Sequence, residues 1–244
     1  MIEESLTGGK MSPKAGVDLK ELKTQKQKEA EKWLGDTVSV ADLKATADQI
    51  KELTNSGWML DFVPSGFNFK KYTTMPILKN YLQSTAIKTE IPLGPFYGRV
   101  LWFMKDRPDP DDPPFADPPT PGRWLFYPEN FFVPGTSMKP LPEQQKMAQQ
   151  SLGSSYQLAQ PAASEVAYLL YLNKWRKETK SLGAKERNSL FLLNDRMVRT
   201  GSPCGKNNEF QVWVGYYTYD NLYVGFCKPG YKAYDLYFCP AVLA

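Results

Sequence analysis

The sequence predicts an α+β protein, and three stretches carry that prediction. Residues 17–34 are rich in Lys, Glu, Gln, Leu and Ala, the residues that favour helix. Residues 161–180 form the strongest helical pattern of the chain, with Pro161 suited to a first turn. From residue 210 the period changes to that of strands, interrupted by turn signals. We expect short antiparallel strands packed with an antiparallel helix pair, an N-terminal helical arm and a C-terminal three-stranded β-meander.

The N-terminal part divides into a tail and an arm. Residues 1–16 contain glycine and proline and few large apolar groups, which predicts a flexible tail. Residues 17–56 form the predicted helical arm, whose first helix has an incomplete apolar stripe and ends at Gly35. In the second helix, Ser39 is the expected N-cap, and the apolar residues that follow recur at helical spacing up to the turn at 55–57.

Residues 57–244 form the predicted core domain. Short buried strands are expected at 58–63, 98–104 and 123–127, and 131–133 is a further candidate. Between them, residues 106–122 are dense in Pro and Asp, which favours a solvated surface excursion or a boundary between two subdomains. Residues 140–160 predict a helix followed by a loop.

The last third of the core combines the helix pair with the meander. Gly183 separates the helix at 161–180 from a partner helix at 184–199, and Gly201 stands where a left-handed cap is expected. The meander strands are expected at 210–219, 222–227 and 232–238, with turns at Asp220-Asn221 and Pro229-Gly230. On the first of these strands, the face that carries Val212 and Val214 is the better candidate for the core.

Composition excludes several kinds of enzyme. The chain contains no histidine, which removes Ser-His-Asp triads, Cys-His dyads, His-Glu-x-x-His zinc helices and histidine-ligated haem. The three cysteines, Cys204, Cys227 and Cys239, are widely spaced, so we expect small buried core residues or one disulfide rather than a zinc site. No metal site, cofactor or catalytic residue is predicted.

The sequence also bears on location. Its first residues have neither the basic start nor the apolar run of a signal peptide. The strongest apolar stretch, 166–172, is far shorter than the roughly 20 residues that cross a bilayer. We therefore expect an intracellular, reducing compartment, cytoplasmic by default, without membrane insertion.

The first candidate binding site is a basic cluster on the predicted helix pair, near its turn, where the side chains could meet phosphates. A solvated helix face with cations near the helix C-termini is the alternative interpretation. The residues of this cluster are Lys174, Arg176, Lys177, Lys180, Lys185, Arg187, Arg196 and Arg199.

The second candidate is an aromatic face of the meander, made of Trp213, Tyr217, Tyr219 and Tyr223. Such a face can stack the bases of a single strand, but it can equally pack beneath a helix or against another subunit.

These features favour a non-enzymatic structural or interaction subunit of a larger assembly. Protein partners or self-assembly are expected, because a half-apolar arm and many tyrosines suit surfaces that a partner covers. Single-stranded nucleic-acid binding by the basic helix pair and the aromatic face is the alternative. A histidine-independent enzyme that uses carboxylate or lysine chemistry is the third hypothesis.

Overall fold

The computed structural model describes residues 18–69, 118–179, 196–218 and 221–244. Helices α1 (Leu19–Leu34), α2 (Ala47–Asn55), α5 (Leu141–Leu152) and α6 (Ala163–Thr179) accompany strands β1 (Trp58–Ser65), β2 (Pro121–Pro128), β3 (Met197–Cys204), β4 (Phe210–Thr218), β5 (Asn221–Cys227), β6 (Leu236–Phe238) and β7 (Val242–Leu243). The α+β class is confirmed. The expected strand at 98–104, most of the Pro/Asp-rich excursion and the start of the partner helix lie outside the described residues.

The described strands form two separate small sheets. One has the order β1-β2-β7 and is antiparallel throughout, with Asp61 of β1 opposite Leu125 of β2. The other has the order β5-β4-β3-β6. Its β4–β5 hairpin and its β3–β4 pair are antiparallel, whereas β6 lies parallel to β3. The third strand therefore does not continue the predicted meander, because the chain after β5 crosses the sheet and pairs on the far side of β3.

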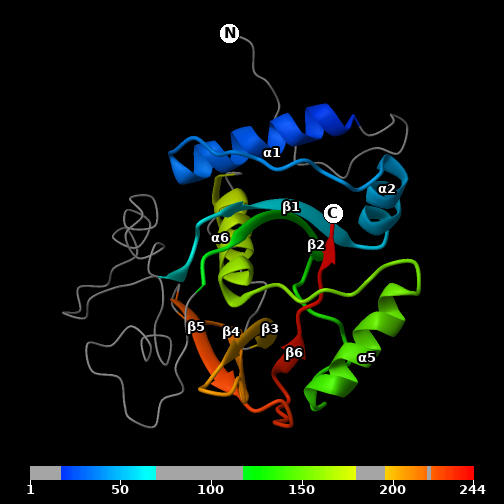
Figure 1. Ribbon diagram of the computed structural model, residues 1–244, viewed down its shortest axis with the longest axis vertical. Helices are drawn as coiled ribbons and strands as arrows, with labels where there is room; N and C mark the ends of the chain where they lie inside the picture. The colour runs from blue at the N-terminus through cyan, green and yellow to red at the C-terminus, as the bar shows by residue number, and fades with distance from the viewer. Residues whose placement is uncertain (1–17, 70–117, 180–195, 219–220) are drawn as a thin grey trace, which may run out of the picture.

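Helix α6 is the centre of the core. Figure 1 shows it, in yellow, between the paired strands β1 and β2 and the strands of the second sheet. Its residues from Val166 to Leu172 are all buried, so the helix is apolar around its whole circumference. The sequence predicted only a core-facing stripe, but strands on opposite sides bury every side chain of this stretch.

Helix α1 packs onto this core through its C-terminal half. Trp33 is buried and meets the Tyr168 ring of α6 edge-on, with the ring centroids 5.0 Å apart. Gly35 ends the helix in the left-handed conformation at φ 71°, as expected for a glycine C-cap. The apolar residues of the incomplete stripe are thus sufficient to dock the last turns, and Leu19 and Leu22 of the first turns, which are half-buried, also pack against the core.

Helix α2 begins later than the sequence predicted. The Thr46 hydroxyl accepts from the Gln49 amide at 3.2 Å, and the Gln49 side chain accepts from the Thr46 amide at 2.9 Å. This reciprocal capping box fixes the helix start, so the Ser39 cap is wrong. Residues 39–46 form irregular backbone instead, in which Val40 and Ala45 are buried.

Four further assignments from the sequence need correction. The partner helix does not reach Arg199, because residues 197–204 form β3. Gly201 lies within that strand and is no helix cap. There a Cβ would stand 2.6 Å from the carbonyl oxygen of Gln160, so the close approach of two backbones requires glycine. Residues 131–133 are not a strand. The last residues of the excursion, Pro121 and Gly122, already belong to β2.

Candidate functional site

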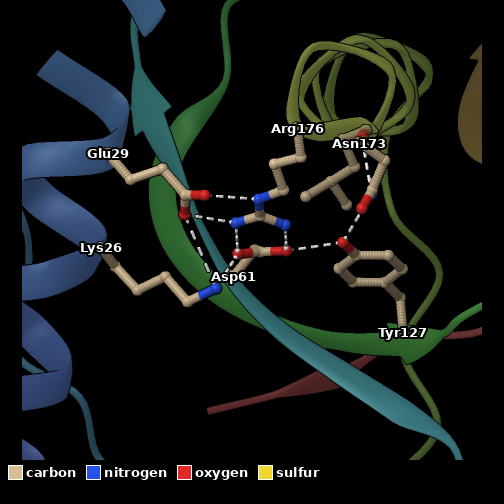
Figure 2. A network of polar contacts seen from close by, with 7 residues as sticks. Lys26, Glu29, Asp61, Tyr127, Asn173 and Arg176 are labelled. Atoms are coloured by element: carbon tan, nitrogen blue, oxygen red, sulfur yellow. Dashed lines mark hydrogen bonds and ion pairs between the residues drawn. The ribbon is translucent and has the colours of Figure 1, made fainter. Parts of the chain in front are cut away.

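The most concentrated cluster of charge surrounds Asp61, a buried residue of β1 (Figure 2). Arg176 of α6 donates to both carboxylate oxygens of Asp61, at 2.8 and 2.5 Å. Lys26 of α1 donates to the same carboxylate at 2.7 Å, and the Tyr127 hydroxyl of β2 donates to it at 2.6 Å. One carboxylate thus connects two helices and two strands.

A second carboxylate completes the cluster. Glu29 of α1 accepts from Arg176 through both of its oxygens, at 2.6 and 2.5 Å. Asn173 donates to the Tyr127 hydroxyl at 2.9 Å and to the carbonyl of Leu169 at 2.8 Å. The cations Lys26 and Arg176 therefore balance the anions Asp61 and Glu29. We call these six residues, Lys26, Glu29, Asp61, Tyr127, Asn173 and Arg176, the Asp61 network.

The electrostatics of this network argue against acid–base chemistry near neutral pH. Burial by itself would raise the pKa of Asp61, but Arg176 and Lys26 outweigh it and hold that pKa well below its usual range. Burial, together with the negative charge of Asp61, raises the pKa of Tyr127 well above its usual value. No group with a shifted pKa in this cluster changes its charge between pH 5 and 8. The contacts of the network join α1 to β1 and α6.

A bidentate pair of the same kind stabilises the start of α6. Arg123 of β2 donates to both oxygens of Glu165 at 2.7 Å. Glu165 also accepts from the amide of Ala162 at 2.7 Å. The carboxylate lies in the first turn of the helix, where it complements the helix dipole and satisfies a free amide.

Two of the pockets on the described surface lie beside β1, β2 and β7. The larger, about 410 Å³, is lined by Ser56, Gly57, Trp58, Pro128, Glu129, Asn130, Phe132, Val133, Pro134 and Ser151. Glu129 is the one ionisable group among these lining residues, so the pocket lacks the second acid that paired-carboxylate chemistry needs. The smaller, about 280 Å³, includes Tyr156, whose hydroxyl donates to Glu52 at 2.6 Å. That bond to Glu52 raises the pKa of Tyr156 to about 12.

Neither a metal centre nor a membrane span is found in the described part of the chain. No group of three or more Cys, Asp or Glu side chains there is placed to hold an ion. The described helices include none that is long and apolar enough to cross a bilayer. Cys204, Cys227 and Cys239 are buried and unbridged, which confirms the prediction of small core residues. Burial raises the pKa of each thiol.

The structure removes two arginines from the predicted basic surface. Arg176 belongs to the Asp61 network, and Arg199 is fully buried in the central strand β3. Arg196 is exposed, with its guanidinium 5.0 Å from the Phe132 ring centroid and 5.8 Å from that of Tyr237. Lys174 and Lys177 lie on α6, but their side chains are outside the described set. Lys180, Lys185 and Arg187 lie wholly outside the described residues.

The predicted aromatic face is partly covered. Trp213 of β4 is half-buried, and its ring lies against the backbone of Gly225 on β5, where a Cβ would stand 2.3 Å away. Tyr217 pairs with Leu222, and Tyr223 pairs with Gly215, but the side chains of these two tyrosines are not described. Tyr219 is outside the described residues. The opposite face, with Val212 and Val214 buried, faces the core as predicted.

A loop after β5 covers the Trp213 face. Residues 228–235 connect β5 to β6, and Ala233 packs beside Trp213 with Met197, Cys227 and Leu236. Arg199 lies on the same face, since its register partner on β4 is Trp213. Its guanidinium donates to the carbonyl of Lys228 at 3.3 Å and to the carbonyl of Tyr231. The buried Arg199 therefore holds the backbone of the 228–235 loop against the sheet.

The 228–235 loop also carries large exposed side chains. Tyr231 is 52 % exposed and Tyr234 is 77 % exposed. Met138, on a neighbouring loop, is 55 % exposed. Its backbone amide donates to the carbonyl of Ala233 at 2.9 Å, which connects the two loops. Lys228 and Lys232 of the same loop are also exposed. We call Met138, Lys228, Tyr231, Lys232 and Tyr234 the tyrosine surface.

Sequence reasoning missed this surface. The turn at Pro229-Gly230 was predicted and is present, with the Tyr231 amide donating to the Lys228 carbonyl at 3.0 Å. The alternation of Lys and Tyr from 228 to 234 was the available signal. It could not be distinguished from a third meander strand, in which every second side chain would point to one face.

No known protein family, curated protein or solved structure matches this chain. The residues and their geometry therefore carry the functional argument.

Proposed function

We propose that this chain is a non-enzymatic interaction subunit whose partner docks on the tyrosine surface. The single observation behind the proposal is the clustering of exposed apolar side chains. The exposed large apolar residues of the described chain are Met138, Tyr231, Tyr234 and Leu243. All except Leu243 belong to two loops that are hydrogen-bonded to each other. Exposed apolar groups gathered in one place indicate an interaction site, whereas scattered ones do not.

The loop is held in place, which favours a binding role. The Arg199 guanidinium binds two of its carbonyls, and the Leu141 amide donates to the Pro229 carbonyl at 2.9 Å. A partner that meets an ordered loop loses less conformational entropy on binding than one that must order it first. Tyrosine adds contact area with few rotatable bonds, so it suits such a surface.

The enzyme hypothesis receives no comparable support. The charges of the Asp61 network are neutralised within the fold, and the larger pocket has a single carboxylate, Glu129. An acid–base site would instead place an ionisable group with a pKa near neutrality in a cleft.

The proposal is tested by site-specific photocrosslinking in the source cells. A photoreactive amino acid at position 234 should give discrete crosslinked species, and the same amino acid at position 243, which is also exposed but lies outside the tyrosine surface, provides the control. The double variant Tyr231→Ser/Tyr234→Ser should lose the partner that the intact protein retains through purification, while Leu243→Ser keeps it. Equal recovery by all variants would show that the partner docks elsewhere, and no crosslink at position 234 would contradict an interaction role for this surface.

A further inference from the structure

The tyrosine surface is positively charged as well as aromatic. Lys228 and Lys232 are exposed within it, and the one carboxylate of the loop, Asp235, is buried below. Burial raises the pKa of Asp235. The neighbouring Lys139 is balanced by Glu143 at 2.7 Å, so it adds no net charge.

Arg199, buried between β3 and the 228–235 loop, adds a further positive charge. Its guanidinium donates to the carbonyl oxygens of Lys228 and Tyr231, and its Nε atom is buried without a hydrogen bond. Among the described residues no carboxylate pairs with it, in contrast to Arg176 and Arg123, which each form a bidentate carboxylate pair. Arginine stays protonated in proteins, so this buried charge adds to the positive potential around the loop.

We infer that the partner of the tyrosine surface is a single-stranded nucleic acid. This inference rests on the interaction function proposed above and specifies the partner. Exposed flat rings stack unpaired bases, and lysines of the same loop can neutralise the phosphates that connect those bases. Tyr231 and Tyr234 are more than half exposed and stand beside Lys228 and Lys232, which supplies both parts of such a site.

The observations favour a nucleic acid over an acidic peptide. A peptide is bound mainly through grooves or through added strand pairing, and both described pockets are lined by residues outside the tyrosine surface. Bases stack on protruding rings without a groove. Paired bases in a duplex do not present their faces, so we expect weaker binding of double-stranded DNA.

The test is fluorescence anisotropy with the full chain and labelled oligothymidine and oligouridine of about twelve nucleotides. Binding should weaken with salt, with a slope of log K against log salt that is shallower by about 1.4 in Lys228→Gln/Lys232→Gln, since each phosphate contact on a single strand contributes about 0.7. The matched control is Lys44→Gln/Lys51→Gln, which removes the same charge from an exposed region around α2.

The ring variants separate stacking from charge. Tyr231→Ser/Tyr234→Ser should weaken binding on the order of ten-fold or more, without a change in the salt slope. Tyr231→Phe/Tyr234→Phe keeps the rings and should bind like the unaltered chain. Circular dichroism and thermal unfolding should be unchanged in all of these variants, because the substituted side chains are exposed.

Three results would overturn the inference. They are no binding of either oligonucleotide at low salt, unaltered binding by the serine double variant, and binding of oligoglutamate with none of the oligonucleotides. The last would identify an acidic protein as the partner. The photocrosslinking experiment reports separately on the interaction function, so a crosslinked protein without nucleic-acid binding would refute this inference alone.

Discussion

The Asp61 network makes a quantitative prediction for the substitution Asp61→Asn. The side chain is 1 % exposed and accepts from Arg176, Lys26 and Tyr127 (Figure 2). Asparagine keeps the shape but removes the negative charge, which leaves Lys26 and Arg176 opposed by Glu29 alone. Removing one partner of a buried ion pair costs about 3–5 kcal/mol, because the remaining charge stays desolvated. For a chain of this length the melting temperature should fall by roughly 6–20 °C.

The measurement is urea unfolding followed by tryptophan fluorescence, with the midpoint and slope compared between variants. The matched control is Asp42→Asn, since Asp42 also pairs with a lysine of α1, Lys23, at 2.6 Å, but its side chain is 95 % exposed. That control should show no measurable loss of stability. A loss below about 1 kcal/mol in Asp61→Asn would refute the reasoning, because it would mean that the buried arginine does not need this carboxylate.

The remaining predictions concern pH, a helix cap, a close backbone approach and the thiols. Because the folded pKa of Asp61 lies below its unfolded value, its contribution is present above about pH 4 and is lost as the pH falls further, so acid titration of Asp61→Asn should lack this component. Thr46→Ala should cost about 1 kcal/mol in urea unfolding, whereas Ser39→Ala should cost nothing measurable. Gly201→Ala should destabilise the fold measurably, and Gly230→Ala, which has open space around it, should not. The three buried thiols should react with a thiol reagent at the rate of unfolding; fast labelling of the folded protein would contradict their burial.

Local signals in the sequence predicted several elements correctly. The composition of 17–34, the glycine at 35 and the apolar run after Pro161 identified α1 and α6, because helix propensity, left-handed caps and burial all act within a few residues. The alternation around Val212 and Val214 identified the buried face of β4 for the same reason. The capping box at Thr46 is also a local sequence pattern. Ser39, which comes earlier in the chain, offered a weaker version of the same pattern.

Other features depended on contacts between distant residues. Arg176 belongs to a basic stretch and looked like a solvated cation, yet it is buried because Asp61, 115 residues away, accepts from it. Arg199 was assigned to a helix, yet it lies in β3, where its neighbours come from β4 and the 228–235 loop. No local pattern distinguishes a paired buried arginine from an exposed one, since the pairing carboxylate lies elsewhere in the chain.

The sequence by itself determined the α+β class, the ends of its clearest helices and the exclusion of histidine chemistry, because these follow from composition and from interactions within a few residues. The tertiary structure alone decided that α6 lies between two sheets, that β6 pairs with β3, and that Tyr231 and Tyr234 remain exposed. Exposure and pairing depend on what lies opposite a residue in space, and for this chain the partners come from segments that are far apart in sequence.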